Sequence, residues 1–171
     1  MTTLSVIVAS SGRPTLARTI ESVRSQMQSG DECLVSVNFD CPWGHAARNQ
    51  LMIAARGDAL MFLDDDDVYV PGALAVVRDK FEQLPDVLHL FKMRYANGSE
   101  LWSTRDIVCG NVSTQMVVVP RIFIVDDDWH ALFARWGHPK YEGDFDFIEE
   151  AHGEIEDVHW HEEVIALVRP E

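Results

Sequence analysis

The chain has 171 residues, 47% of them hydrophobic and 25% charged, which excludes a disordered protein and suits one folded domain with its own core. Its formal net charge of −14 repels phosphate backbones and anionic membranes, so the composition argues against nucleic acid as a partner. The three cysteines are widely spaced and form neither a CxxC pair nor a zinc pattern, which suits reduced thiols in an intracellular protein.

The first half of the chain shows alternating strand and helix patterns. Two short apolar runs and, between them, one segment of alternating apolar residues predict three strands, and each is followed by apolar residues at helical spacing. Such alternation is typical of a parallel sheet connected by crossover helices. The expected strands are residues 4–9, 33–39 and 59–63, and the expected helices cover residues 16–27, 47–55 and 71–84.

The second half is less regular. It predicts a hairpin, two further strands and two helices, with an Asn-Gly turn joining the hairpin. We therefore expect a single α/β domain over residues 1–171, with a mostly parallel central sheet flanked by helices and a smaller mixed C-terminal part. The hairpin strands are residues 87–95 and 100–102, the other strands 112–119 and 164–168, and the helices 128–136 and 144–151.

Four consecutive aspartates, residues 64–67, directly follow the third expected strand. In open parallel sheets, ligands bind beyond the carboxyl ends of the strands. One aspartate would be enough to cap the next helix, whereas four adjacent carboxylates repel one another unless a cation neutralises them. We interpret the run as a divalent-cation site, with a solvated capping loop as the alternative. A cation there would bind a diphosphate leaving group, in either sugar transfer or nucleotidyl transfer.

Two blocks of sequence resemble the inverting glycosyltransferases of family 2, which have the GT-A fold. The first covers residues 4–16 and 20–26. The second is more specific: an Ala-Arg-Asn at residues 47–49, an Ala-x-Gly, a strand ending in Leu-Asp-x-Asp-Asp, and a proline four residues on. This resemblance implies a Rossmann-like GT-A fold, a nucleoside-diphosphate sugar donor (a UDP-sugar above all) and Mn²⁺ or Mg²⁺. It implies a nucleotide-binding half at about residues 1–85 and a half that binds the acceptor and completes the metal site at about 86–171.

The resemblance assigns roles within the acidic run. Asp64 and Asp66 match the DxD motif, with Asp66 as the best candidate for direct metal ligation. Asp65 or Asp67 would face the ribose or a metal-bound water. Arg48 would lie near the phosphate or the base of the nucleotide, with an exposed helix charge as the alternative.

Two positions depart from the family pattern. The family often has Asp-Asp-Gly-Ser after the second strand, where an aspartate holds the base, and this chain has Asn-Phe-Asp-Cys-Pro. Asp40 is therefore the candidate for that role. Ser10 stands where a threonine or proline is frequent in the family, and it is a candidate for nucleotide contact.

An inverting transfer needs a base beside the acceptor hydroxyl. The resemblance aligns Asp144 with that base, and Gly143 stands where the family usually has an acid. The alternative is that Asp144 only caps the next helix. Asn111 and Gln115 lie just before and within the polar first part of the expected strand 112–119, and they are candidates either to bind sugar hydroxyls or to cap strand ends.

A late histidine often completes the metal site in GT-A enzymes. His159 and His161 would share one face of an extended segment, so either could serve, with a structural role as the alternative. An imidazole ligand would favour Mn²⁺ over Mg²⁺.

The sequence thus predicts a metal-dependent glycosyltransferase that moves a sugar to an unidentified acceptor hydroxyl, with Asp144 as base. A sugar nucleotidyltransferase and a non-catalytic nucleotide-sugar-binding protein are the alternatives. Against the first, the N-terminal turn of this chain lacks the Gly-rich, basic phosphate loop that nucleotidyl transfer uses. The first residues lack the features of a signal peptide, and no apolar stretch is long enough to span a membrane, so we expect a cytoplasmic protein.

Overall fold

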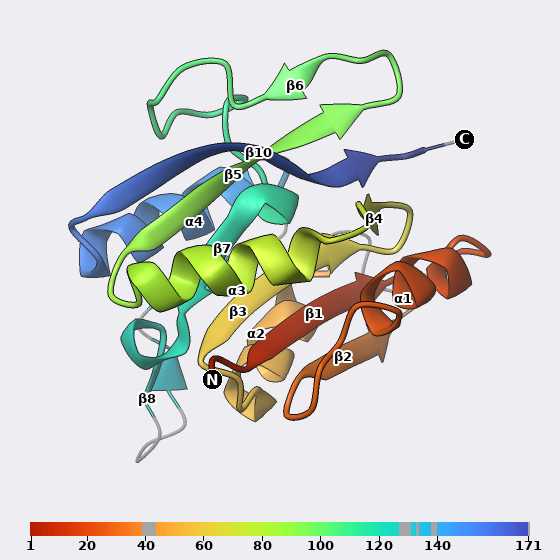
Figure 1. The fold of residues 1–171 in the computed structure, drawn as a ribbon, viewed down its shortest axis with the longest axis horizontal. Coiled ribbons are helices and arrows are strands. Elements are labelled where there is room, and N and C mark those ends of the chain that lie inside the picture. The colour runs from red at the N-terminus through yellow and green to blue at the C-terminus, as the bar shows by residue number, and fades with distance from the viewer. Residues whose placement is uncertain (39–43, 127–130, 133, 138–139, 171) are drawn as a thin grey trace.

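The computed structural model describes residues 1–38, 44–126, 131–132, 134–137 and 140–170. In this part of the chain, eight strands form one mixed sheet in the order β2-β1-β3-β7-β5-β10-β4, with β6 paired to β5 (Figure 1). Five strands run in one direction and three in the other. The five are β1 (Leu4–Ser10), β2 (Glu32–Val37), β3 (Ala59–Asp64), β5 (Leu88–Tyr95) and β10 (Val158–Val168), and the three are β4 (Val68–Tyr69), β6 (Glu100–Leu101) and β7 (Val117–Pro120).

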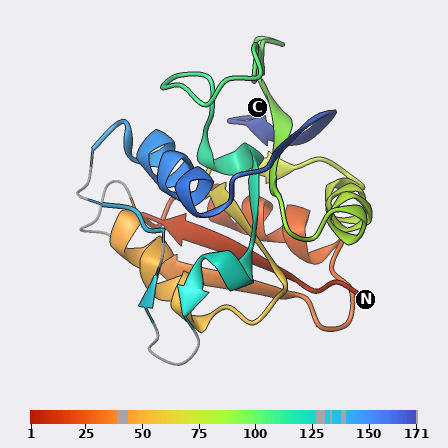
Figure 2. The same ribbon diagram turned by 90° about the vertical axis from the view of Figure 1, so that its left-hand side faces the viewer.

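Helices cover both faces of the sheet (Figure 2). One face carries α1 (Leu16–Arg24) and α3 (Ala73–Gln83), and the other carries α2 (His45–Ala54) and α4 (Gly143–Glu154). Residues from both layers and from the sheet form one contiguous hydrophobic core. These features confirm the expected α/β domain with a mostly parallel sheet. None of the helices in the described ranges has the length and apolar character needed to cross a membrane.

The central strands are buried because they are almost entirely apolar. All seven residues of β1 are buried, and so are the first five of β3. The two strands pair in parallel, with Ala9 opposite Asp64. The last residue of β3 is therefore the first aspartate of the acidic run, and it emerges at the carboxyl edge of the sheet.

Two expectations for the second half are wrong. The expected strand over residues 112–119 is confined to β7, because a 3₁₀ turn at Thr114–Met116 precedes it. The expected helix over residues 128–136 does not form in its described part: Ala131–Leu132 is strand β9, paired with β8 (Val125–Asp126). Ala134 and Trp136 are buried while Arg135 is exposed, so the side chains alternate as in an extended segment.

Candidate active site

A cavity of about 630 Å³ opens at the carboxyl ends of β1 and β3. Its wall combines the β1–α1 turn, the acidic run, the turn after β5, the start of α4 and the residues at the end of β10. This is the edge of the sheet at which open α/β folds bind ligands. Seven residues that the sequence singled out line it: Ser10, Arg48, Asp64, Asp65, Asp66, Gln115 and Asp144.

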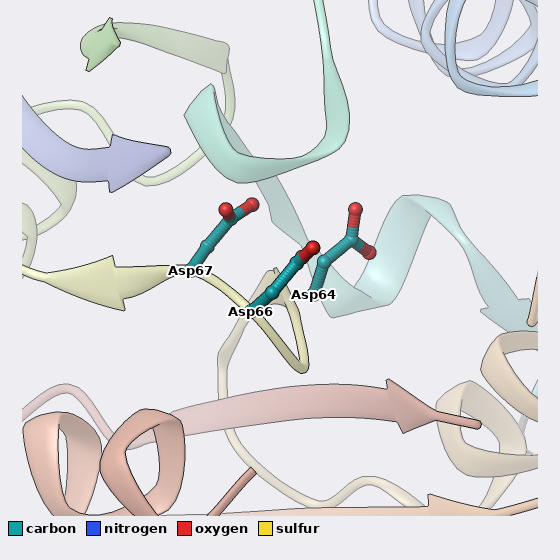
Figure 3. Close-up of side chains that lie close together, drawn as sticks. All are labelled: Asp64, Asp66 and Asp67. Atoms are coloured by element: carbon teal, nitrogen blue, oxygen red, sulfur yellow. The ribbon is translucent and has the colours of Figure 1, made fainter. Parts of the chain in front are cut away.

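Three of the four adjacent aspartates gather at one point. Asp64, Asp66 and Asp67, called the aspartate cluster below, each place one carboxylate oxygen within 4.8 Å of the other two. Figure 3 shows the three side chains rising from the loop on the same side. The cluster uses both ends of the tight turn between β3 and β4, which brings residues 64 and 67 together.

Arg48 forms an ion pair with Asp64. Its guanidinium donates to Asp64 Oδ1 and lies over the Trp136 ring, 5.3 Å from the centroid. The arginine is only 3% exposed, so its charge is buried together with its partner. Desolvation raises the pKa of Asp64 and Arg48 opposes it, while the nearby Asp144 raises it further. Arg48 is thus a buried counter-ion of the cluster and not the exposed helix charge that was the alternative.

Asp67 is the deepest member of the cluster, with 1% of its surface exposed. Gln115 Nε2 donates to its Oδ2 at 2.6 Å and to Asp64 Oδ2 at 3.0 Å, and the backbone N–H of Arg169 donates to its Oδ1 at 2.9 Å. Burial raises the pKa of Asp67 to about 7, and the charge of Asp64 adds to this rise. The carboxylate therefore lies where additional positive charge would be stabilising.

Asp65 turns away from the cluster toward the end of β1. Its Oδ2 accepts from Ser10 Oγ at 2.7 Å and from the Ser11 backbone N–H at 3.0 Å. The Ser10 hydroxyl in turn accepts from the Gly12 backbone N–H at 2.9 Å. Ser10 and Asp65 thus hold the β1–α1 turn in place at the rim of the cavity. The structure gives Asp65 a role in shaping this turn, and the expectation that Asp65 or Asp67 faces the ribose or a metal-bound water stays a prediction.

Asp144 lies in the first turn of α4, on the same cavity. Its Oδ2 accepts from Ser113 Oγ at 3.2 Å and from the Thr114 backbone N–H at 3.4 Å. These bonds tie the start of α4 to the 3₁₀ turn before β7. The residue before it, Gly143, packs so closely on His45 that a Cβ at position 143 would lie 2.1 Å from His45 Cε1. The chain therefore has glycine beside Asp144 because the His45 ring fills that space.

The structure does not bring His159 or His161 to the aspartates. Both lie near the start of β10, opposite the start of β5, whereas the residues that meet the aspartate cluster follow the other end of β10. About eight residues of extended strand separate the two places, on the order of 25 Å. The buried His161 instead donates to or accepts from His89 Nδ1 at 2.9 Å and stacks on Phe91. The expectation that either histidine completes the metal site is not met.

The aspartate cluster fits a divalent cation. Its donors are carboxylate oxygens at mutual distances that one ion could bridge, and they carry more negative charge than their buried surroundings favour. With both expected histidines elsewhere, the donors are oxygens alone, so the earlier reason to prefer Mn²⁺ over Mg²⁺ no longer applies.

Three contributors were missed or left open by sequence reasoning. Gln115 bridges two aspartates from the turn before β7, and Arg13 and Arg169 both pair with Asp66, the latter at 3.2 Å. Only the tertiary fold brings these residues together, since they lie about 50 to 100 residues from their partners in the chain. Asp40 lies outside the described residues.

Comparison with known proteins gives a family and a fold. The sequence profile described as "Glycosyl transferase family 2" matches residues 40–134, more than half of the chain. No curated protein sequence matches significantly. Among solved structures, S. aureus TarS 1–349 superposes with a TM-score of 0.70 at 12% identity, over 98% of this chain and 60% of that one. The same protein in complex with UDP-GlcNAc gives 0.68 at 12% identity, over 98% and 58%, and in complex with UDP 0.65 at 10%, over 98% and 60%.

The chain thus spans about 60% of the length of the TarS 1–349 structure, whose fold it shares. The profile match includes the aspartate cluster itself and two residues that contact it, Arg48 of α2 and Gln115. The chain belongs to glycosyl transferase family 2 and has its GT-A fold.

Proposed function

We propose that this domain transfers a sugar from a uridine-diphosphate sugar to an acceptor hydroxyl, with inversion at the anomeric carbon. The observation that carries the proposal is the meeting of the aspartate cluster and Asp144 at one cavity. A cation site suits a diphosphate leaving group, and a separate carboxylate in the same cavity suits a base.

Asp64, Asp66 and Asp67 are the residues that would hold the divalent cation. When bound, Mg²⁺ or Mn²⁺ neutralises negative charge on the diphosphate. Gln115 and Arg48 keep the carboxylates of Asp64 and Asp67 together by hydrogen bonds and charge, so the cluster is preorganised before any ligand arrives.

Asp144 is proposed to take the proton from the acceptor hydroxyl. As that oxygen forms its bond to the anomeric carbon, the bond from the carbon to the diphosphate oxygen breaks, and the nucleoside diphosphate leaves on the opposite face. Hydrogen bonds from Ser113 and Thr114 to Asp144 Oδ2 hold the carboxylate in one orientation. Preorganisation of this kind favours proton transfer because the base needs no rearrangement in the transition state.

A uridine donor is supported by the TarS structures, which were solved in complex with UDP-GlcNAc and with UDP. The cavity of about 630 Å³ is in the range of pockets that enclose ligands of this size. The acceptor is a hydroxyl compound that shares this cavity with the donor.

The test is a panel of nucleotide sugars, scored by calorimetric binding and by release of nucleoside diphosphate, with Mg²⁺, with Mn²⁺ and with EDTA. We expect at least one UDP-sugar to bind in a cation-dependent manner and to be turned over slowly, with water as the default acceptor. Formation of nucleoside triphosphate and sugar 1-phosphate when pyrophosphate is added would indicate nucleotidyl transfer instead. Binding without release, across a panel of acceptors, would indicate a non-catalytic protein, and the absence of any binding would contradict the proposal outright.

A further inference from the structure

Two arginines from distant parts of the chain converge on Asp66. Arg13 comes from the β1–α1 turn and contacts Asp66 Oδ2, with a second contact of 3.3 Å to Asp65 Oδ1. Arg169 follows the last residue of β10 and places its Nε 3.2 Å from the same Asp66 oxygen. Both arginines line the cavity. Asp66 Oδ2 therefore forms ion pairs with two guanidinium groups within the aspartate cluster.

The two arginines differ from Arg48 in their exposure. The Arg48 side chain is 4% exposed, whereas those of Arg13 and Arg169 are 47% and 75% exposed. A buried guanidinium that leaves its carboxylate loses a compensating charge where water cannot replace it, but an exposed one can turn into solvent or toward a ligand at small cost. Arg48 is therefore a permanent partner, and the other two are exchangeable.

The backbone of Arg169 adds an independent observation. Its φ is 45°, which makes it the one non-glycine residue with positive φ among the residues that the structure describes. This conformation is unfavourable for a side chain with a Cβ and persists only where contacts impose it. The Arg169 N–H bond to Asp67 Oδ1 supplies such a contact. Both the backbone and the side chain of Arg169 are thus held by members of the aspartate cluster.

We infer that Arg13 and Arg169 are internal counter-ions that exchange partners during donor binding. They neutralise Asp66 while no divalent cation is present. When a cation takes up the Asp66 oxygen, it repels the two guanidinium groups, which turn to the diphosphate oxygens of the donor in the same cavity. This inference rests on the proposed donor class, because it assigns the diphosphate as their second partner.

The exchange predicts opposite effects on two binding steps. Replacing either arginine with glutamine removes a competitor for Asp66, so Mn²⁺ or Mg²⁺ alone should bind about threefold more tightly or better. The same replacement removes a charge-assisted contact to the diphosphate, so UDP should bind about tenfold more weakly at saturating cation. A residue with a merely structural role would weaken both steps or neither.

The experiment measures three ligands by calorimetry on Arg13→Gln, Arg169→Gln and the double variant: the cation alone, UDP with saturating cation, and uridine. Uridine lacks the diphosphate, so its affinity should stay unchanged. Arg18→Gln is the matched control, because it removes the same charge from an exposed position on α1 outside the cavity. It should leave all three affinities unchanged.

Two results would overturn the inference: cation affinity that is unchanged or weaker in both arginine variants, or UDP affinity equal to that of the wild type. Misfolding does not imitate the expected pattern, since a damaged site would not bind the cation more tightly. If wild-type protein binds no UDP at all, the proposed function fails instead, and the cation measurement still decides whether the arginines compete for Asp66.

Discussion

The side-chain amide of Asn49 forms hydrogen bonds with both the backbone carbonyl and the backbone N–H of Trp136. Asn49 Nδ2 donates to the Trp136 carbonyl oxygen at 2.8 Å, and the Trp136 N–H donates to Asn49 Oδ1 at 3.0 Å. Trp136 stacks on Phe147 of α4, and its ring lies beneath Arg48. The Ala-Arg-Asn motif therefore has two tasks: the arginine meets the aspartate cluster, and the asparagine fixes the aromatic residue that supports it.

Replacing Asn49 with alanine should lower the free energy of unfolding by about 2 kcal/mol, because two hydrogen bonds are lost and the polar groups of Trp136 are left without partners. Chemical denaturation measures this change. Gln50→Ala on the exposed side of the same helix is the control, and we expect it to change stability by less than about 0.5 kcal/mol. If the two substitutions changed the free energy of unfolding equally, the hydrogen bonds from Asn49 to Trp136 would not contribute to stability.

Replacing Asp144 with asparagine should reduce turnover by about 10²-fold or more and leave cation-dependent donor binding nearly unchanged. The amide retains the shape of the side chain but cannot accept the proton. Glu149→Gln is the matched control, since this residue is exposed on the same helix and does not line the cavity. Unchanged turnover in Asp144→Asn would rule out this residue as the base.

The contact between His45 and Gly143 predicts a specific rescue. Gly143→Ala should impair turnover because the new Cβ collides with the His45 ring beside the base. Adding His45→Ala opens the space, so the double variant should regain part of the turnover lost in Gly143→Ala. Gly153→Ala in the same helix is the control, because a Cβ there has nothing within 4 Å, and it should leave activity intact. Strictly additive losses in the double variant would argue against a direct clash.

The buried histidine pair predicts sensitivity to acid. The Leu84 carbonyl can only accept, so His89 Nε2 carries the proton and its Nδ1 accepts from His161 Nε2 at 2.9 Å. Burial lowers the pKa of His89 to about 4, and burial together with His89 and His159 lowers that of His161 to about 3. Because the unfolded chain binds these protons near pH 6.5 and the folded chain does not, stability should fall as the pH drops from about 6.5 to 4.

The loss from His89 alone should be on the order of 3 kcal/mol over that pH range. Denaturation midpoints measured between pH 4 and 7 test this. The double variant His89→Phe/His161→Phe removes both titrating groups, so its stability should depend less steeply on pH, whatever its absolute value. A slope as steep as that of the wild type would show that other groups cause the acid sensitivity. His152→Asn in α4 is a control for a histidine outside the pair.

The sequence predicts the first half of the fold well because its signals are local. β1 and β3 are short apolar runs, and the strand signal at β2 is an alternation of apolar residues. Each is followed by apolar residues at helical spacing, and the family resemblance covers the same part of the chain. The position of the acidic run at the end of β3 follows directly from that pattern. Gln115 and Arg169 could not be assigned this way, since their link to Asp67 depends on how β7 and β10 join the sheet.

The two histidines show a different limit. Both fall within β10, which begins six residues before the expected strand 164–168, and their distance to the aspartates depends on the direction of β10. Because β10 runs parallel to β5, its carboxyl end faces the cavity and its histidines lie at the amino end. The expected helix over residues 128–136 is wrong for another reason: an acidic run followed by apolar residues is typical of a helix start, but the alternating burial of residues 134–136 is that of an extended segment.

The pairing of Ala9 with Asp64 has a consequence for comparing relatives of this protein. Four identical residues in a row can be aligned in more than one register, yet each of the four carboxylates has a different set of partners in the structure. The strand register removes that freedom, because the aspartate opposite Ala9 is the one that Arg48 meets. Homologues with shorter or longer acidic stretches are therefore best aligned by the residue that pairs with the end of their first strand.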